Sequence, residues 1–159
     1  MKRFVINRFK KKQNTDDVDG GVRKRFDSNA PKTIDCTKIV DFVCVFSTLT
    51  IADEPDLERS VFTLEANTVN ASYKSRSEEF VFSTPSAFME ELQSIVSEYD
   101  FAQFNGITYH VSGLPDMFGA TVSVKYESGE CIYSANNQDL FIPLDAIKKM
   151  LMLFKKRKI

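Results

Sequence analysis

The sequence predicts an α+β fold, in which an antiparallel β-sheet carries two helices packed on one face. Two observations support this prediction. Short segments of alternating hydrophobicity are separated by turn residues, which is typical of strands in an antiparallel sheet. Two longer segments, 85–99 and 143–155, repeat their apolar residues at helical spacing instead. Because a hairpin precedes each of these helices, the pattern also suggests two duplicated ββα units.

The chain is expected to divide into a tail and one domain. Residues 1–30 begin with a basic run, and the stretch 13–21 is polar and ends in two glycines. We therefore expect a largely flexible N-terminal tail and linker over 1–30. A single α+β domain is expected over 31–159, because about 130 residues are enough to bury one hydrophobic core.

The strongest strand prediction covers 38–51. Apolar residues occupy both of its faces at the centre, with Phe42 and Cys44 on one side and Val43 and Val45 on the other. Such a strand is typical of a sheet that is covered on both sides. Alternation predicts the remaining strands over two segments within 60–75 and over 78–84, 107–111, 120–126 and 131–135.

Both helices carry sequence signals at their ends. Thr84 is expected to cap the first helix and Pro85 to occupy its first position. Its apolar stripe consists of Phe88, Leu92, Ile95, Val96 and Tyr99. The second helix is expected to begin at Pro143 and to end in a lysine-rich turn, where positive charge is favoured by the helix dipole.

Charge is strongly segregated along the chain. Residues 1–25 hold nine basic and three acidic residues and 148–159 hold six basic and no acidic residues, so each end carries +6. The stretch 26–147 carries −13, although the whole chain carries −1. Either the basic ends pair with the acidic body, or they contact an anionic partner, such as a membrane surface or nucleic acid. Nucleic acid is disfavoured, because the acidic body would repel phosphate.

The three cysteines, Cys36, Cys44 and Cys131, show no paired spacing. We expect reduced thiols, and therefore a protein of the reducing cytoplasm. The apolar part of the N-terminal segment is too short for a signal peptide, and no run of 18 apolar residues predicts a transmembrane segment.

Little in the sequence points to catalysis. His110 is the single histidine, it lies in a predicted strand, and no G-x-S-x-G motif accompanies it. The weak catalytic candidates are His110 and Asp116, as the base and carboxylate of a small hydrolase or transferase. Neither metal-ligand spacing nor a glycine-rich phosphate loop occurs, so no metal ion and no cofactor are expected.

Two polar loops flank the predicted hairpin at 120–135. We expect them to meet at one edge of the sheet and to form a binding lip. The candidate binding residues are Ser112, Asp116, Met117, Phe118, Asn136, Asn137 and Gln138. Loops of this kind carry function more often than the elements they connect.

Four motifs over the C-terminal half resemble a family. They are FAQFNG at Phe101–Gly106, SGLPDMFG at Ser112–Gly119, YESGECIY at Tyr126–Tyr133 and NNQ at Asn136–Gln138. With STL at Ser47–Leu49 and FMEELQ at Phe88–Gln93, they are similar to a group of small uncharacterised Firmicutes proteins of gut bacteria. The resemblance covers roughly 31–154 and implies a bacterial, cytoplasmic domain, but it carries no activity and no catalytic residue.

These observations together favour a non-enzymatic binding or protein-interaction domain. A protein partner, or a second copy of the chain, is the expected ligand. The alternatives are the hydrolase or transferase that uses His110 and a carboxylate, and a domain that binds an anionic lipid or nucleic-acid surface through its basic termini.

Overall fold

The computed structural model describes residues 17–19, 21–113 and 118–158. Its strands are β1 (Asp17–Asp19), β2 (Val22–Phe26), β3 (Ile39–Ser47), β4 (Val61–Asn67), β5 (Asn70–Lys74), β6 (Glu79–Ser83), β7 (Ile107–Val111), β8 (Ala120–Tyr126) and β9 (Cys131–Asn136). Its helices are α1 (Ser86–Glu98), the short 3-10 helix η1 (Phe101–Phe104) and α2 (Leu144–Lys155).

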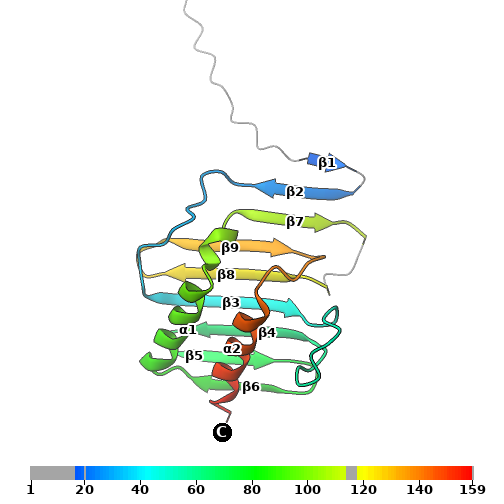
Figure 1. Ribbon diagram of the computed structural model, residues 1–159. Coiled ribbons are helices and arrows are strands. Elements are labelled where there is room, and N and C mark those ends of the chain that lie inside the picture. Colours follow the sequence, from blue (N-terminus) through cyan, green and yellow to red (C-terminus); the bar gives the residue numbers. More distant parts are fainter. Residues whose placement is uncertain (1–16, 20, 114–117, 159) are drawn as a thin grey trace, which may run out of the picture.

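All described strands form one sheet in the order β1-β2-β7-β9-β8-β3-β4-β5-β6 (Figure 1). Every neighbouring pair is antiparallel except β7 and β9, which run parallel. The order of a hairpin followed by a helix occurs twice, as β5-β6-α1 and as β8-β9-α2. The predicted α+β class with an antiparallel sheet is confirmed.

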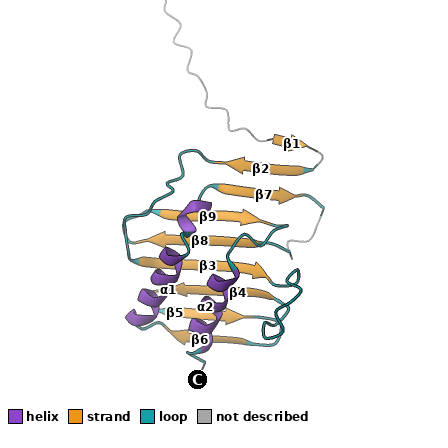
Figure 2. Cartoon of the chain, viewed as in Figure 1, coloured by secondary structure: helices purple, strands orange, loops and turns teal. Residues whose placement is uncertain are grey.

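Both helices lie on the same face of the sheet (Figure 2). Beneath them, three aromatic rings make edge-to-face contacts: the centroids of Phe82 and Phe88 are 5.2 Å apart, and Phe154 lies 6.0 Å from Phe82 and 5.1 Å from Phe88. Such pairs contribute beyond the area they bury. The helix-facing residues of the central strand β3, Phe42, Cys44 and Phe46, are fully buried in the same core.

The opposite face of the sheet is not covered by either helix. Val43 and Val45 of β3 point to this face and are only partly buried. The prediction that β3 is covered on both sides is therefore wrong. Valine is stable on a half-exposed strand surface because its branched side chain packs against neighbours across the pleat, so two apolar faces do not by themselves require two covering layers.

The sheet extends further toward the N-terminus than the predicted domain boundary at residue 31. β2 pairs along its full length with β7, from Val22 opposite Val111 to Phe26 opposite Ile107. The side chains of β2 alternate between the two faces, but three of its five residues are basic, so its composition resembles that of the tail before it. Of the predicted tail, residues 1–16 and 20 lie outside the described residues.

The start of α1 differs in detail from the predicted cap. Pro85 occupies the N-cap position, and no side chain caps the helix. The Thr84 hydroxyl instead donates a hydrogen bond of 2.8 Å to the carbonyl oxygen of Asn67. The residue expected to cap the helix therefore ties the end of β6 to the turn between β4 and β5.

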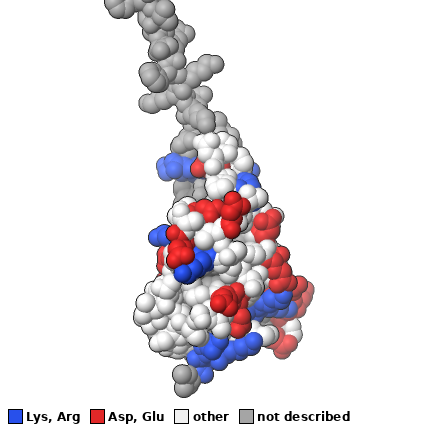
Figure 3. Space-filling model, turned by 90° about the vertical axis from the view of Figure 1, so that its left-hand side faces the viewer, with Lys and Arg blue, Asp and Glu red and all other residues white. Residues whose placement is uncertain are grey.

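The basic C-terminal helix pairs with acidic residues of the domain. Lys148 bonds Glu54 at 2.7 Å, Lys149 bonds Glu98 at 2.7 Å, and Lys158 bonds Glu78 at 2.8 Å. Figure 3 shows basic side chains gathered near the C-terminal end, with acidic ones over the middle of the molecule. Of the two interpretations of the basic ends, the described part of the C-terminus accords with pairing to the acidic body.

The three thiols differ in accessibility. Cys44 is fully buried, and burial raises its pKa. Cys36 is half-buried and Cys131 is exposed. Because only an accessible thiolate reacts, we expect a maleimide to modify Cys36 and Cys131 in the folded protein and to reach Cys44 only after denaturation. Mass spectrometry of the adducts checks this, and modification of Cys44 in native buffer would contradict the packing of β3.

No described helix has both the length and the apolar character needed to cross a membrane.

Candidate functional site

A hollow of about 620 Å³ lies on the uncovered face of the sheet. Its lining residues come from six neighbouring strands, β2, β7, β9, β8, β3 and β4, and from the loop ends beside them. They are Arg23, Arg25, Val45, Phe46, Ser47, Val61, Thr108, Tyr109, His110, Gly119, Ala120, Thr121, Tyr133, Ala135, Asn136 and Asn137. We call this hollow the cross-strand groove.

The register of the sheet explains why a groove forms there. One row of side chains runs across the strands from Arg25 through Thr108, Ala135 and Thr121 to Val45. A second row, at the adjacent end of the strands, begins with Arg23 opposite His110 and ends with Ser47 opposite Val61. Gly119, which has no side chain, and Ala135 are the smallest residues near the middle of these rows. The surface of the sheet is therefore recessed there, between the larger residues at either end.

The groove is long and shallow. Neighbouring strands are about 4.8 Å apart, so the five spacings from β2 to β4 span about 24 Å. An extended peptide rises about 3.3 Å per residue, so this length corresponds to about seven residues. A volume of about 620 Å³ spread over such a length fits a single extended chain better than a compact ligand.

The two ends of the groove differ in chemical character. Arg23, Arg25 and His110 lie at the end formed by β2 and β7, whereas Val45 and Val61 lie at the end formed by β3 and β4. Among the described lining residues there is no aspartate or glutamate. In a body that carries −13 over 26–147, this local absence of carboxylates gives the groove a positive end.

The loop after β9 is held by its own polar side chains. The side-chain amide of Asn137 makes two hydrogen bonds to the backbone of Val111. Its Oδ1 accepts one of 2.9 Å from the Val111 N–H, and its Nδ2 donates one of 3.0 Å to the Val111 carbonyl, as the backbone of a paired strand residue would. The Asn136 side chain accepts bonds from the amides of Gln138 and Asp139, at 2.9 and 3.0 Å. Asn136 and Asn137 line the groove, so their predicted place at a binding surface stands as a prediction.

The two predicted polar loops meet at Gly119. A Cβ atom at this position would lie 1.6 Å from the Asn136 carbonyl oxygen and 2.6 Å from its carbon. The backbone of Gly119 also accepts a hydrogen bond of 2.9 Å from the Ser47 amide. This close approach joins the loop before β8 to the end of β9, and both residues line the groove.

Of the remaining predicted site residues, His110 lines the groove, Ser112 and Phe118 are not among its lining residues, and two lie outside the described part of the chain. His110 is exposed on β7, within the strand predicted at 107–111. Ser112 is exposed beyond the end of β7, and the side chain of Phe118 is 36% exposed. Asp116 and Met117 lie outside the described residues, so the pairing of His110 with Asp116 stays a prediction.

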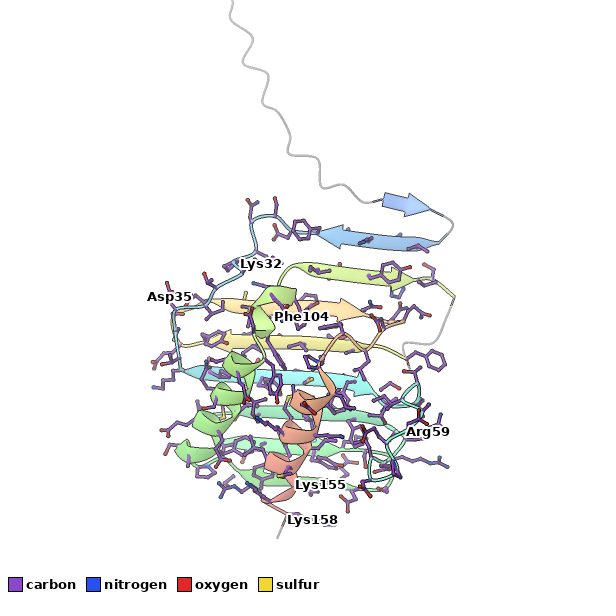
Figure 4. The ribbon with its side chains drawn as sticks, in the orientation of Figure 1. Lys32, Asp35, Arg59, Phe104, Lys155 and Lys158 are labelled. Carbon is purple, nitrogen blue, oxygen red and sulfur yellow. The ribbon has the colours of Figure 1, made fainter. Side chains whose placement is uncertain are left out.

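Perturbed titratable groups occur away from the groove. The Ser128 hydroxyl, followed by the backbone amides of Asp35 and Cys36, donates hydrogen bonds to the Glu130 carboxylate and lowers its pKa. Burial raises the pKa of Tyr126 to about 12. Both groups have structural explanations. Tyr126 is buried in the hydrophobic core. Glu130 fastens the segment before β3, where Figure 4 labels Asp35, to the turn between β8 and β9.

The described residues contain no group of three or more His, Cys, Asp or Glu side chains that could hold a metal ion.

No family model, no curated protein and no solved structure matches this chain. The groove must therefore be interpreted from its own chemistry.

The arginines of the groove were not among the predicted binding residues. Arg23 and Arg25 fall in the stretch interpreted as linker. Three of the five residues of this short alternating strand are basic, so its composition resembles that of the tail. The alternation of VRKRF, with arginines on one face and Val22, Lys24 and Phe26 on the other, was the available signal.

Proposed function

We propose that this protein is a non-enzymatic binding domain whose cross-strand groove takes an extended, acidic segment of a partner protein. The observation that carries the proposal is the pair of arginines at one end of a long groove whose described lining contains no carboxylate. Arginine presents a planar set of donors that matches a carboxylate in a two-pronged geometry.

The other groove residues support a peptide as the ligand. Thr108, Thr121 and Tyr133 place hydroxyl groups along its length, and these can donate to or accept from a peptide backbone. Val45 and Val61 provide apolar contact at the far end. A segment with acidic residues at one end and small apolar residues at the other therefore fits the groove in one direction only.

The free thiols support the cytoplasm as the location of the protein.

A matched pair of substitutions tests the proposal. Arg23 faces the groove, and Lys24, the next residue of β2, faces the opposite side of the sheet. The probe is a synthetic peptide of about seven residues with two glutamates at one end and valine and serine residues after them. We expect Arg23→Gln to weaken its binding by roughly three- to tenfold in calorimetric titration, and Lys24→Gln to leave the affinity unchanged.

Two comparisons complete this experiment. A peptide with glutamine in place of glutamate should bind more weakly to the wild-type chain, and added salt should reduce that difference. Equal effects of Arg23→Gln and Lys24→Gln would indicate general charge attraction, and would contradict binding in the groove. Tighter binding of a single-stranded oligonucleotide than of the acidic peptide would also overturn the proposal.

A further inference from the structure

The two edges of the sheet are protected to different degrees. β1, at one edge, has three residues, and two of them are aspartates. β6, at the other edge, has the sequence Glu79-Phe80-Val81-Phe82-Ser83, and pairs with β5 alone among the described strands. Short length, lysine, proline and bulges are the usual devices that prevent an edge strand from pairing. β6 contains no lysine, no proline and no bulge in its register with β5.

The hydrogen bonds beside β6 identify its outward backbone groups. The amide of Thr84 donates to the Val69 carbonyl at 3.0 Å, and the amide of Ser75 donates to the Glu78 carbonyl at 2.8 Å. Bonded residues alternate along an antiparallel pair, so the even-numbered residues of β6 bond β5. The N–H and C=O groups of residues 79, 81 and 83 therefore point away from the sheet.

We propose that β6 pairs with β6 of a second copy of this chain, antiparallel and with Val81 on the two-fold axis, to form one continuous sheet. In this register, Glu79 lies opposite Ser83 of the second copy and Val81 lies opposite its own equivalent. Phe80 lies opposite Phe82, which gives an aromatic cross-strand pair on the helix-bearing face. No two like charges within β6 oppose one another.

The surroundings of β6 agree with this symmetric arrangement. The side chain of Val81 is 68% exposed, and pairing would cover part of it. Lys158 lies three residues beyond the end of α2 (Figure 4) and is bonded to Glu78, the residue before β6. A two-fold axis at Val81 places the basic C-termini of the two copies at opposite ends of the shared strand pair. The positive ends of the two chains therefore do not oppose each other.

The expected dimer is weak, because a single pair of five-residue strands buries less than a standard interface. The interaction uses the opposite end of the sheet from the positive end of the cross-strand groove, so it does not depend on the proposed function. Sedimentation equilibrium of the full chain should show a monomer at low concentration and a reversible dimer at concentrations approaching about 1 mM. A strict monomer throughout this range would overturn the proposal.

Val81→Pro is the decisive variant. Proline lacks the N–H that points outward at this position, and proline is tolerated on an edge strand when that N–H faces solvent. We expect the variant to keep the wild-type circular dichroism spectrum and to lose the dimer. If the variant folds and still forms the dimer with unchanged affinity, β6 is not the interface.

A charge pair at residue 83 provides a second test that does not depend on proline. Ser83→Lys places a lysine opposite Glu79 of the second copy twice in the symmetric dimer, and Ser83→Glu places like charges there instead. We expect the first variant to tighten the dimer roughly two- to tenfold and the second to weaken it by a similar factor. Equal dissociation constants for the two variants, or the reverse order, would contradict the register.

Discussion

Gly119→Ala is expected to destabilise the domain by about 4 kcal/mol or more, because the new methyl group has no space. A Cβ atom at this position would lie 1.6 Å from the Asn136 carbonyl oxygen and 2.9 Å from the carbonyl carbon of Asn137. These are backbone atoms of a loop that also bonds β7, so they cannot move without breaking other contacts. Denaturant unfolding monitored by circular dichroism measures the loss.

Gly113→Ala is the control for this prediction. Gly113 has a φ of +82°, and no atom of the described residues lies within 4 Å of a Cβ atom built there. Only the backbone strain of an alanine in the left-handed region remains, which costs about 1 kcal/mol. A similar loss for both variants would show that conformational freedom, and not the close approach of the two loops, makes glycine necessary at residue 119.

Asn105→Ala should destabilise the domain by about 3 kcal/mol, because it leaves three backbone groups without partners in a buried site. The Asn105 side chain is 4% exposed. Its amide nitrogen donates to the carbonyl oxygens of Pro31 and Cys131 at 2.9 and 3.0 Å, and its oxygen accepts from the Tyr133 amide at 2.9 Å. One side chain thereby joins the segment before β3, strand β9 and the end of η1.

The replacement of Asn105 by aspartate separates hydrogen bonding from packing. Asn105→Asp keeps the shape and the acceptor for Tyr133, but it places one carboxylate oxygen against the carbonyl oxygens of Pro31 and Cys131. We expect it to be at least as destabilising as alanine. The exposed neighbour Gln103 provides the control, since Gln103→Ala should change the free energy of unfolding by less than about 0.5 kcal/mol. A stable Asn105→Asp variant would contradict the assigned bonds.

The sequence predicted the parts of the fold that depend on local pattern. Both helices end within one or two residues of their predicted bounds, and the strand at 107–111 agrees with β7. The predicted hairpin at 120–135 corresponds to β8 and β9. In each case the hydrophobic period is clear over the whole segment, and turn residues mark its ends.

The features that the sequence did not predict depend on pairing between distant segments. β2 belongs to the sheet because it pairs antiparallel with β7, and the basic composition of β2 does not indicate this pairing. β3 is open on one face because both helices pack on the other, which two apolar strand faces cannot reveal. The groove exists because the register brings Gly119 and Ala135 between larger residues, and no local motif encodes that arrangement.

Binding of an acidic peptide in the cross-strand groove can be mapped residue by residue through amide chemical shifts measured by NMR. The acidic peptide of about seven residues is titrated into isotopically labelled protein. We predict that the largest shifts fall on Arg23, Thr108, Thr121 and Ala135, and that the amides of α1 and α2 stay unchanged. Shifts that concentrate on the helices, or that spread evenly over all basic residues, would contradict binding in the groove.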